Sequence, residues 1–209
     1  MPDGATPLGV PRIGVPRIGV LGGTFDPVHI GHLVVAVEAR HQLGLDRVLL
    51  VVANDPWQKR GSRAMTPAAD RLAMTRAAVE GLAGIEVSSL EVDRGGPSYM
   101  VDTLTSLRSQ YPGTQLLLIV GADVAAQMGT WDRATELPAL ASLVVACRGG
   151  APAGTVPPGW TVVDLPVPRL DVSSSELRER LREGRPVDFL VPEAAMRCIE
   201  QRGLYAGAT

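Results

Sequence analysis

Short apolar runs rich in β-branched residues alternate with helical segments along most of the chain, and this alternation constrains the fold most strongly. Two of the runs, residues 116–120 and 143–146, contain only apolar side chains. Continuous apolar runs are typical of strands buried on both faces, and the helices between them provide the crossovers that parallel strands need. The pattern therefore predicts an α/β, doubly wound parallel sheet with helices on both faces.

The expected strands and helices follow one another in a regular order. The strands are placed at residues 18–21, 48–52, 85–92, 116–120, 143–146 and 161–165. The helices are placed at residues 30–43, 67–80, 100–110, 174–183 and 193–202. This order predicts one Rossmann-like domain, in which ligands bind beyond the carboxyl ends of the strands. We therefore expect functional side chains in the loops that follow the strands.

The N-terminal residues form a short repeat that does not fit the rest of the pattern. Residues 9–13, Gly-Val-Pro-Arg-Ile, recur at residues 14–18. A five-residue repeat with a proline in each copy is too short for a solenoid. We interpret residues 1–16 as a flexible leader and residues 17–205 as a single domain, which suits a chain of 209 residues with 45% hydrophobic content.

Charge and cysteine content narrow the classes of partner. The formal net charge is −2 at pH 7, so there is no broad basic field and nucleic acid is not an expected partner. Cys147 and Cys198 lie far apart without metal-ligand spacing, which is typical of reduced cysteines in a cytosolic protein. No apolar run is long enough to span a bilayer, and no signal-peptide pattern is present. We expect a cytoplasmic protein with no membrane partner, and homo-oligomerisation stays open.

One segment combines glycines with histidines directly after an expected strand. Residues 22–32 read Gly-Gly-Thr-Phe-Asp-Pro-Val-His-Ile-Gly-His and reach the start of an expected helix. Glycines let the backbone come close to a phosphate, and a helix N-terminus supplies N–H donors. His29 and His32 lie three residues apart and can share one side of the first turn, where Gly31 leaves room for a nucleotide. Such imidazoles can donate hydrogen bonds to phosphate oxygens that gain charge during a transfer reaction.

A second segment places hydroxyl groups and an arginine at the start of another expected helix. Residues 172–178 read Val-Ser-Ser-Ser-Glu-Leu-Arg. Ser173 and Glu176 match a capping box, which by itself explains the serines. The alternative is that the hydroxyls and Arg178 together hold a polyphosphate. The first segment favours this alternative, because both segments would then serve one nucleoside triphosphate.

The first segment resembles the signature of the nucleotidyltransferase superfamily, which carries His or Thr, any residue, Gly and His. Residues 22–32 also match throughout the opening of bacterial nicotinate mononucleotide adenylyltransferases, Gly-Gly-Thr-Phe-Asp-Pro followed by His-x-Gly-His. The second segment resembles this family's Ile-Ser-Ser-Thr-x-x-Arg, with mild departures at Val172 and Ser175. Residues 97–104 resemble its Pro-Ser-Tyr-Thr-x-x-Thr-Leu, with Met100 in place of a threonine.

The resemblance extends over residues 17–205 and implies a role for each matched position. The catalytic residues that it implies are His29, His32, Lys59 and Arg178. The ATP-binding residues that it implies are Gly22, Gly23, Thr24, Phe25, His29, His32, Gly121, Asp123, Ser173, Ser174 and Arg178. The acceptor-binding residues that it implies are Asn54, Lys59, Met100, Thr103 and Trp131. Without the resemblance, Lys59 reads as a solvated lysine, Asp123 as a helix cap and Trp131 as a core or interface residue.

The reaction implied by the resemblance is the transfer of AMP from ATP to nicotinate mononucleotide, which gives deamido-NAD and pyrophosphate in NAD biosynthesis. The acceptor phosphate, with a second pKa of about 6, is already a nucleophile at neutral pH, so no covalent enzyme intermediate is required. Catalysis then consists of positioning and charge neutralisation. Mg²⁺ is the expected cofactor, bound mainly through the ATP phosphates, and no protein metal ligands are assigned.

Three alternative functions stay open. A phosphopantetheine adenylyltransferase shares both end segments, but the loops that carry Lys59 and Trp131 argue against it. A class I aminoacyl-tRNA synthetase is suggested by His-Ile-Gly-His, but the chain is short for that role, is not basic and lacks a Lys-Met-Ser-Lys-Ser loop. A non-catalytic nucleotide sensor is expected to lose one of the histidines or Arg178, and none of these is lost.

The preference for one pyridine depends on residues 97–104. Met100 cannot supply the hydroxyl that a threonine supplies in the resembled family, whereas Thr103 lies roughly one helical turn further on and can face the same side. Backbone N–H donors do not depend on the side chain. We therefore expect the nicotinate carboxylate to be preferred over the nicotinamide amide.

Overall fold

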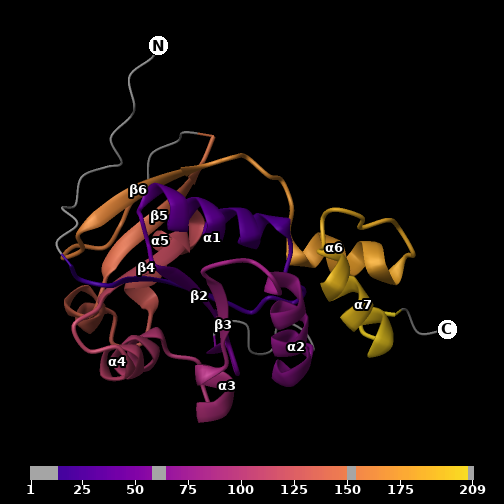
Figure 1. The fold of residues 1–209 in the computed structure, drawn as a ribbon, viewed down its shortest axis with the longest axis horizontal. Helices are drawn as coiled ribbons and strands as arrows, with labels where there is room; N and C mark the ends of the chain where they lie inside the picture. Colours follow the sequence, from indigo (N-terminus) through magenta and orange to yellow (C-terminus); the bar gives the residue numbers. More distant parts are fainter. Residues whose placement is uncertain (1–13, 58–64, 150–153, 207–209) are drawn as a thin grey trace.

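The structure is a computed structural model that describes residues 14–57, 65–149 and 154–206. Its centre is one sheet of parallel strands in the order β3-β2-β1-β4-β5-β6 (Figure 1). The strands are β1 (Arg17–Gly23), β2 (Arg47–Val52), β3 (Ile85–Ser88), β4 (Gln115–Gly121), β5 (Ser142–Arg148) and β6 (Val162–Val167). The predicted α/β, doubly wound, Rossmann-like sheet is confirmed.

Helices cover both faces of this sheet (Figure 1). The α-helices are α1 (Ile30–Gln42), α2 (Ala68–Val79), α3 (Leu90–Arg94), α4 (Met100–Gln110), α5 (Ala122–Ala125), α6 (Ser174–Arg182) and α7 (Glu193–Gln201). The described 3₁₀ helices are η2 (Met128–Thr130) and η3 (Ala134–Ala139). Helices α1, α2, α6 and α7 contribute to one hydrophobic core, and α4, α5, η2 and η3 contribute to a second core.

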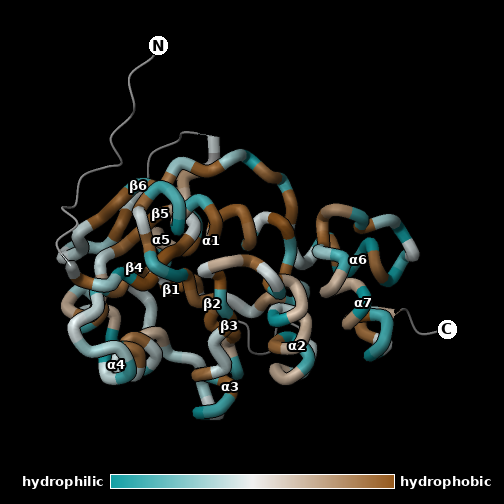
Figure 2. Tube along the Cα trace, in the orientation of Figure 1, coloured by the Kyte–Doolittle hydropathy of each residue, from teal (hydrophilic) through white to brown (hydrophobic). Residues whose placement is uncertain are grey.

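Alternate residues of a central strand enter the two cores. Leu117 and Ile119 of β4 pack in the first core, whereas Leu116, Leu118 and Val120 pack in the second. Successive side chains of a strand point to opposite faces, so a strand that is covered on both sides has to be apolar throughout. Figure 2 shows hydrophobic residues along the central strands and many hydrophilic residues on the outer helices.

The strand order reverses at β1, and this reversal places the site. The chain passes from β1 to β2 on one side, while β4 pairs with β1 on the other side. The loops after β1 and β4 therefore diverge and leave a crevice at the carboxyl ends of the two strands. Ligands of open α/β sheets bind at such a reversal point, which is where the glycine and histidine segment begins.

Two parts of the secondary structure differ from the sequence prediction. The strand predicted at residues 85–92 ends at Ser88, and α3 begins at Leu90. The hydroxyl of Ser88 accepts a hydrogen bond from the N–H of Leu90 over 3.3 Å, which turns the chain away from the sheet. Residues 122–139, for which no element was predicted, form α5, η2 and η3, and the last of these contains Pro138. Elements this short carry no 3.6-residue pattern that a sequence reading could detect.

Most of the predicted leader, residues 1–13, lies outside the described residues. The carbonyl of Pro16 accepts a hydrogen bond from the N–H of Gln115 over 2.9 Å, and β1 begins at the next residue. The described chain therefore joins the sheet close to the predicted start of the domain, although the domain boundary itself stays a prediction.

Candidate active site

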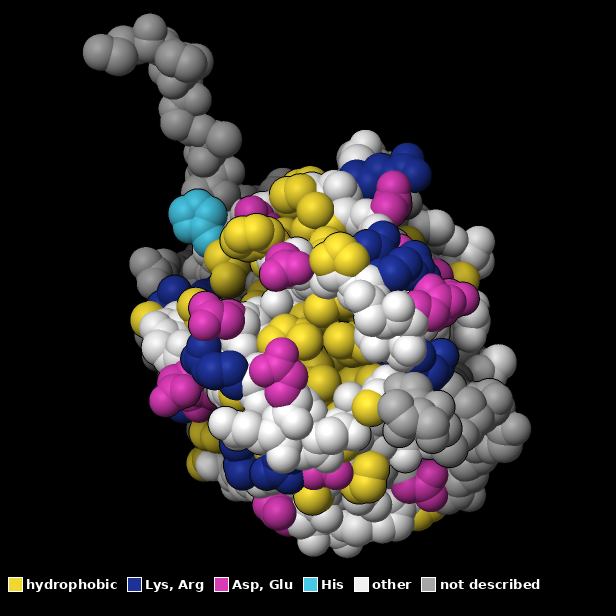
Figure 3. All heavy atoms as spheres, turned by 90° about the vertical axis from the view of Figure 1, so that its right-hand side faces the viewer, with side chains coloured by type: hydrophobic (Ala, Val, Ile, Leu, Met, Phe, Trp, Pro, Cys, Tyr) yellow, Lys and Arg dark blue, Asp and Glu magenta, His cyan; other side chains and the backbone are white. Residues whose placement is uncertain are grey.

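A cavity of about 910 Å³ opens at the carboxyl ends of the central strands. Its lining comes from the loops after β1, β2 and β4, from the start of α1 and from the start of α6. Figure 3 shows the side of the molecule that lies on the right in Figure 1, where hydrophobic side chains lie in a hollow with charged side chains of both signs around it. One cavity thus collects both segments that the sequence singled out.

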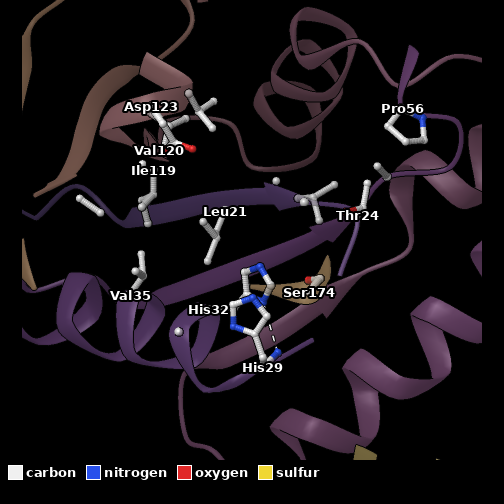
Figure 4. Close-up of a pocket in the computed structure, with 18 of the residues that line it drawn as sticks. Leu21, Thr24, His29, His32, Val35, Pro56, Ile119, Val120, Asp123 and Ser174 are labelled. Carbon is white, nitrogen blue, oxygen red and sulfur yellow. Dashed lines mark hydrogen bonds between the residues drawn. The ribbon is translucent and has the colours of Figure 1, made fainter. Parts of the chain in front are cut away.

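His29 and His32 lie at the first turn of α1 and line the cavity. Their rings are stacked, with centroids 3.7 Å apart and an interplanar angle of 28°. The backbone N–H of His29 donates a hydrogen bond to Nδ1 of His32 over 3.2 Å. A ring nitrogen that accepts a hydrogen bond carries no proton, so the proton of neutral His32 resides on Nε2. Figure 4 shows the two rings near Leu21 of β1 and Ser174 of α6.

Glycines in the first segment make room for neighbouring side chains. A Cβ at Gly31 would lie 3.1 Å from two ring atoms of His29 and 3.1 Å from Cγ1 of Val172, so the absence of a side chain lets the His29 ring pack there. A Cβ at Gly23 would lie 2.9 Å from the ring of Phe25. The Phe25 side chain is 1% exposed and belongs to the first core. The Phe25 side chain therefore packs against the glycine turn, and the predicted role of Phe25 in ATP binding, which its backbone can serve, stays a prediction.

The start of α6 is joined to the first segment. Ser174 donates a hydrogen bond from Oγ to the carbonyl of Pro27 over 2.9 Å. Arg178, which is 6% exposed, donates from Nη1 to the carbonyl of Asp26 over 2.6 Å and from Nη2 to Oγ of Ser175 over 3.0 Å. Two segments about 150 residues apart in sequence are thereby fixed side by side at the cavity.

Ser173 is the N-cap of α6, as the capping-box interpretation predicts. Its Oγ accepts a hydrogen bond from the N–H of Glu176 over 3.2 Å. Ser173 and Ser174 nevertheless line the cavity beside Arg178. The structural and the phosphate-binding interpretations are therefore compatible, because a capped helix start still presents N–H groups to an anion.

Asp26 joins the first segment to the C-terminal part of the chain. Its side chain is fully buried, and Oδ1 accepts a hydrogen bond from the hydroxyl of Tyr205 over 2.6 Å. Burial and this hydrogen bond to Asp26 raise the pKa of the Tyr205 phenol above its usual value. Arg178 binds the carbonyl of the same residue, so Asp26 is held from both sides of the turn.

Two residues predicted for the acceptor, Met100 and Trp131, lie on the second-core side of the cavity. Met100 and Trp131 line it, together with Trp57 and Tyr99. Asn54 is not part of the lining; its amide donates a hydrogen bond to the carbonyl of Gly96 over 2.9 Å. Lys59 lies outside the described residues.

Thr103 does not reach the cavity. It is fully buried, and its hydroxyl is bonded to Oε1 of Glu91 and to the carbonyl of Tyr99. The prediction that this hydroxyl faces the acceptor is wrong, because the side of α4 that carries Thr103 packs against α3. Met100, three residues earlier in α4, does line the cavity.

Glu91 is a cavity residue that the sequence reading missed. It is 3% exposed and lines the cavity beside Ser98 and Met100. Burial raises the pKa of its carboxyl group, while hydrogen bonds from Ser98 and Thr103 act in the opposite direction. A single acidic residue after a short strand carries no sequence signal, because α3, which places it, was not expected.

Gly121 and Asp123 follow β4 and line the cavity. A Cβ at Gly121 would lie 2.6 Å from Oδ1 of Asp123, so the carboxylate folds back over the glycine. No side-chain hydrogen bond caps α5, which disfavours the helix-cap alternative for Asp123. Figure 4 shows Asp123 on the side of β1 opposite to the histidine rings.

Two kinds of site are absent from the described part of the chain. No group of three or more His, Cys, Asp or Glu side chains there could hold a metal ion. No helix there has the length and apolar character needed to cross a membrane.

A family model described as cytidylyltransferase-like matches residues 20–180, which include both segments at the cavity. The chain belongs to the cytidylyltransferase-like family. The predicted nucleotidyltransferase class is thereby confirmed.

Curated relatives match almost the whole chain. It is 46% identical over 186 residues to a Thermus thermophilus protein named "probable nicotinate-nucleotide adenylyltransferase", a match that covers 89% of this chain and 97% of that one. It is 44% identical over 190 residues to a protein of the same name from Streptomyces coelicolor, with 90% and 100% coverage. A third protein of that name, from Corynebacterium kroppenstedtii, is 44% identical over 189 residues, with 89% coverage of both chains.

The fold is also similar to solved structures. A Plasmodium falciparum nicotinic acid mononucleotide adenylyltransferase complexed with NaAD superposes with a TM-score of 0.72 at 19% identity, covering 91% of this chain and 97% of that one. The same enzyme complexed with APC gives a TM-score of 0.71 at 18% identity, with the same coverage. At this level of identity, the likeness shows that this chain and the Plasmodium falciparum enzyme share a fold.

Proposed function

We propose that this protein transfers AMP from ATP to nicotinate mononucleotide and releases pyrophosphate, forming deamido-NAD in NAD biosynthesis. The observation that carries the proposal is the meeting of both helix starts at one cavity, with Arg178 bonded to the backbone of the first segment. The proteins named "probable nicotinate-nucleotide adenylyltransferase" that match at 44–46% identity over most of the chain support the same activity.

We propose that ATP binds on the side of the two helix starts. Gly22, Gly23 and Thr24 supply backbone close to the phosphates, and the hydroxyls at the start of α6 lie across the cavity. The Nε2–H of His32 can donate to an oxygen of the triphosphate, because its Nδ1 is already occupied by the N–H of His29. Arg178 adds a buried positive charge at the outer phosphates.

We propose that the acceptor binds on the side of Trp57, Met100 and Trp131. The two indoles and the phenol ring of Tyr99 line this side, and a flat pyridine ring stacks well on such surfaces. Lys59 stays a prediction for this side, carried by the resemblance alone. Asp123, whose carboxylate lies over Gly121, is proposed to bind a ribose hydroxyl of ATP.

The reaction needs no group on the protein to become covalently attached. A phosphate oxygen of the acceptor forms a bond to the α-phosphorus of ATP, the bond from that phosphorus to the bridging oxygen breaks, and pyrophosphate leaves with the electron pair. Side chains position the two phosphates and neutralise the charge that develops on the leaving group. Mg²⁺ would arrive with ATP and offset phosphate charge.

One assay separates this function from its alternatives. Purified protein with Mg²⁺ and ATP is given nicotinate mononucleotide, nicotinamide mononucleotide or phosphopantetheine in parallel, and pyrophosphate release is measured. Release with nicotinate mononucleotide and formation of deamido-NAD are expected. Release only with phosphopantetheine would identify the alternative transferase, and ATP binding without release would identify a nucleotide sensor. A cytoplasmic location, independence from nucleic acid and membranes, and the oligomeric state stay predictions.

A further inference from the structure

Arg71 of α2 lies beneath the site and is not part of its lining. The side chain is 1% exposed. Its guanidinium donates hydrogen bonds to four backbone carbonyls. Nε donates to Thr66 over 2.8 Å, and Nη2 donates to Asn54 over 3.0 Å. Nη1 donates to both Thr24 over 2.8 Å and Ala53 over 2.6 Å.

These carbonyls belong to two loops that serve different sides of the cavity. Thr24 lies in the loop after β1, directly after the glycines of the proposed ATP side. Ala53 and Asn54 lie in the loop after β2, which leads to Trp57 of the proposed acceptor side. Nη1 bridges the carbonyls of Thr24 and Ala53 directly. A single rigid group therefore sets the separation of the two loops.

The loop after β2 is also hydrogen-bonded to the segment that precedes α4, on the proposed acceptor side of the cavity. The N–H of Asn54 donates to Oγ of Ser98 over 2.9 Å, and the N–H of Ser98 donates to the carbonyl of Asp55 over 2.9 Å. Ser98 directly precedes Tyr99 and Met100, which line the cavity. The β2 loop is thus held between Arg71 on one side and the start of α4 on the other.

The chemistry of arginine suits this position better than that of lysine. The guanidinium is planar and directs its N–H groups in a fixed fork, so four carbonyls can be held at set positions. An ammonium group is a compact point charge with three rotatable donors and no fork. A lysine would keep the buried charge but would leave some of the carbonyls without a donor.

We infer that Arg71 is a positioning residue that sets the distance between the β1 loop, which holds ATP, and the β2 loop, which leads to the acceptor. The inference rests on the proposed function, because it concerns the alignment of two substrates. Arg71 touches neither substrate, so its loss should impair the step in which both are aligned more than the binding of either one. A misplacement of about 1 Å can lower a rate by roughly 100-fold.

The test compares Arg71→Lys and Arg71→Gln with matched changes at Arg76, which lies on the same helix and is exposed. Melting temperature and the folded fraction are measured for each variant, and kcat and both KM values are then calculated per folded enzyme. Arg71→Lys is expected to lower kcat by about 30- to 100-fold while each KM changes less than about threefold. Arg76→Lys and Arg76→Gln are expected to match the wild type.

Two other results for the Arg71 variants would reject the inference. If Arg71→Lys has a lower melting temperature but an unchanged kcat per folded enzyme, Arg71 serves stability alone and the inference is rejected. Failure of both Arg71 variants to fold would also reject the positioning role. A wild-type protein that releases no pyrophosphate with any acceptor would instead overturn the proposed function itself, a result that is visible before any variant is made.

Discussion

The imidazole rings of His29 and His32 are stacked at a centroid distance of 3.7 Å, and the N–H of the first residue donates to Nδ1 of the second. This contact fixes both the orientation of the His32 ring and the position of its proton. A donor that is already oriented costs no rearrangement when charge develops in a transition state. The pair is therefore prepared before a nucleotide arrives.

Replacing His32 with alanine should remove most turnover while ATP still binds. Loss of one such donor typically lowers kcat by about 100- to 1,000-fold, because the imidazole contributes most where charge develops. Turnover is measured by pyrophosphate release, and ATP affinity by calorimetry. His41→Ala, at the exposed end of α1, is the control. Near wild-type turnover in His32→Ala would contradict the proposed role.

Replacing Gly31 with alanine should disturb the same pair without removing it. The new Cβ would lie 3.1 Å from the His29 ring and from Val172, a distance at which the neighbours must give way. We expect kcat to fall while the melting temperature changes little, because the His29 ring is displaced from its stacked position. Gly154→Ala, where nothing lies within 4 Å, is the control. An unchanged kcat would show that the ring position is not important.

Replacing Arg178 with lysine should weaken the use of ATP more than the use of the acceptor. The guanidinium forks between the carbonyl of Asp26 and the hydroxyl of Ser175, and an ammonium cannot reproduce this geometry. We expect the KM for ATP to rise several-fold more than the KM for nicotinate mononucleotide. Arg182→Lys, on the exposed end of the same helix, is the control. A rise in the KM for nicotinate mononucleotide alone would show that Arg178 acts on the acceptor and would contradict its assignment to ATP.

The acceptor preference should still favour the acid. The hydroxyls of Ser98 and Thr103 are bonded to Glu91, and we expect backbone N–H groups to bind the nicotinate carboxylate. A charge-assisted hydrogen bond is worth roughly 1.5–3 kcal/mol, so one restored by Met100→Thr would raise discrimination by about 10- to 150-fold. The measurement is kcat/KM for nicotinate against nicotinamide mononucleotide in both proteins. Equal or better use of the amide by the wild type would reject the acid preference, though not adenylyl transfer.

Replacing Tyr205 with phenylalanine should destabilise the fold in a pH-dependent way. The phenol donates to the buried Asp26, and hydrogen bonds to charged groups contribute roughly 1.5–3 kcal/mol. The pKa of Tyr205 is raised in the folded state, so its contribution is fully present below the unfolded pKa of about 10 and is lost as the pH rises above it. Urea unfolding at pH 8 and pH 11 should show the difference from wild type narrowing. Tyr111→Phe is the control, and an equal difference at both pH values would contradict the assignment.

The sheet can be predicted from the sequence alone because the apolar pattern of each strand is contained in consecutive residues. An apolar run such as residues 116–120 reports burial on both faces of the strand, and no distant residue is needed to interpret it. The turn from Gly22 to His32 is predictable for the same reason, because glycine, histidine and the helix start are consecutive. The starts of α1, α4 and α6 accordingly fall where the pattern places them.

Residues whose roles depend on distant partners could not be predicted in this way. Thr103 fits the expected helical spacing from Met100, yet its hydroxyl is hydrogen-bonded to Glu91. Glu91 lies on α3, a helix too short to show a periodic pattern in the sequence. Phe25 lies within residues 22–32, the glycine and histidine segment, but its side chain packs in the hydrophobic core. Arg71 is one arginine among many in the sequence, and only the folded chain brings four carbonyls to it.

The bond between Tyr205 and Asp26 joins residues that are 179 positions apart. On a ribosome, which adds about 5–20 residues per second, the turn that carries Asp26 would wait roughly 10 to 35 s for the tyrosine to be made. Arg178, the other group that holds this turn, is also among the last to be synthesised. All six strands are therefore synthesised before the turn is secured, and a translation product that ends before Arg178 would contain the strands without either group that holds this turn.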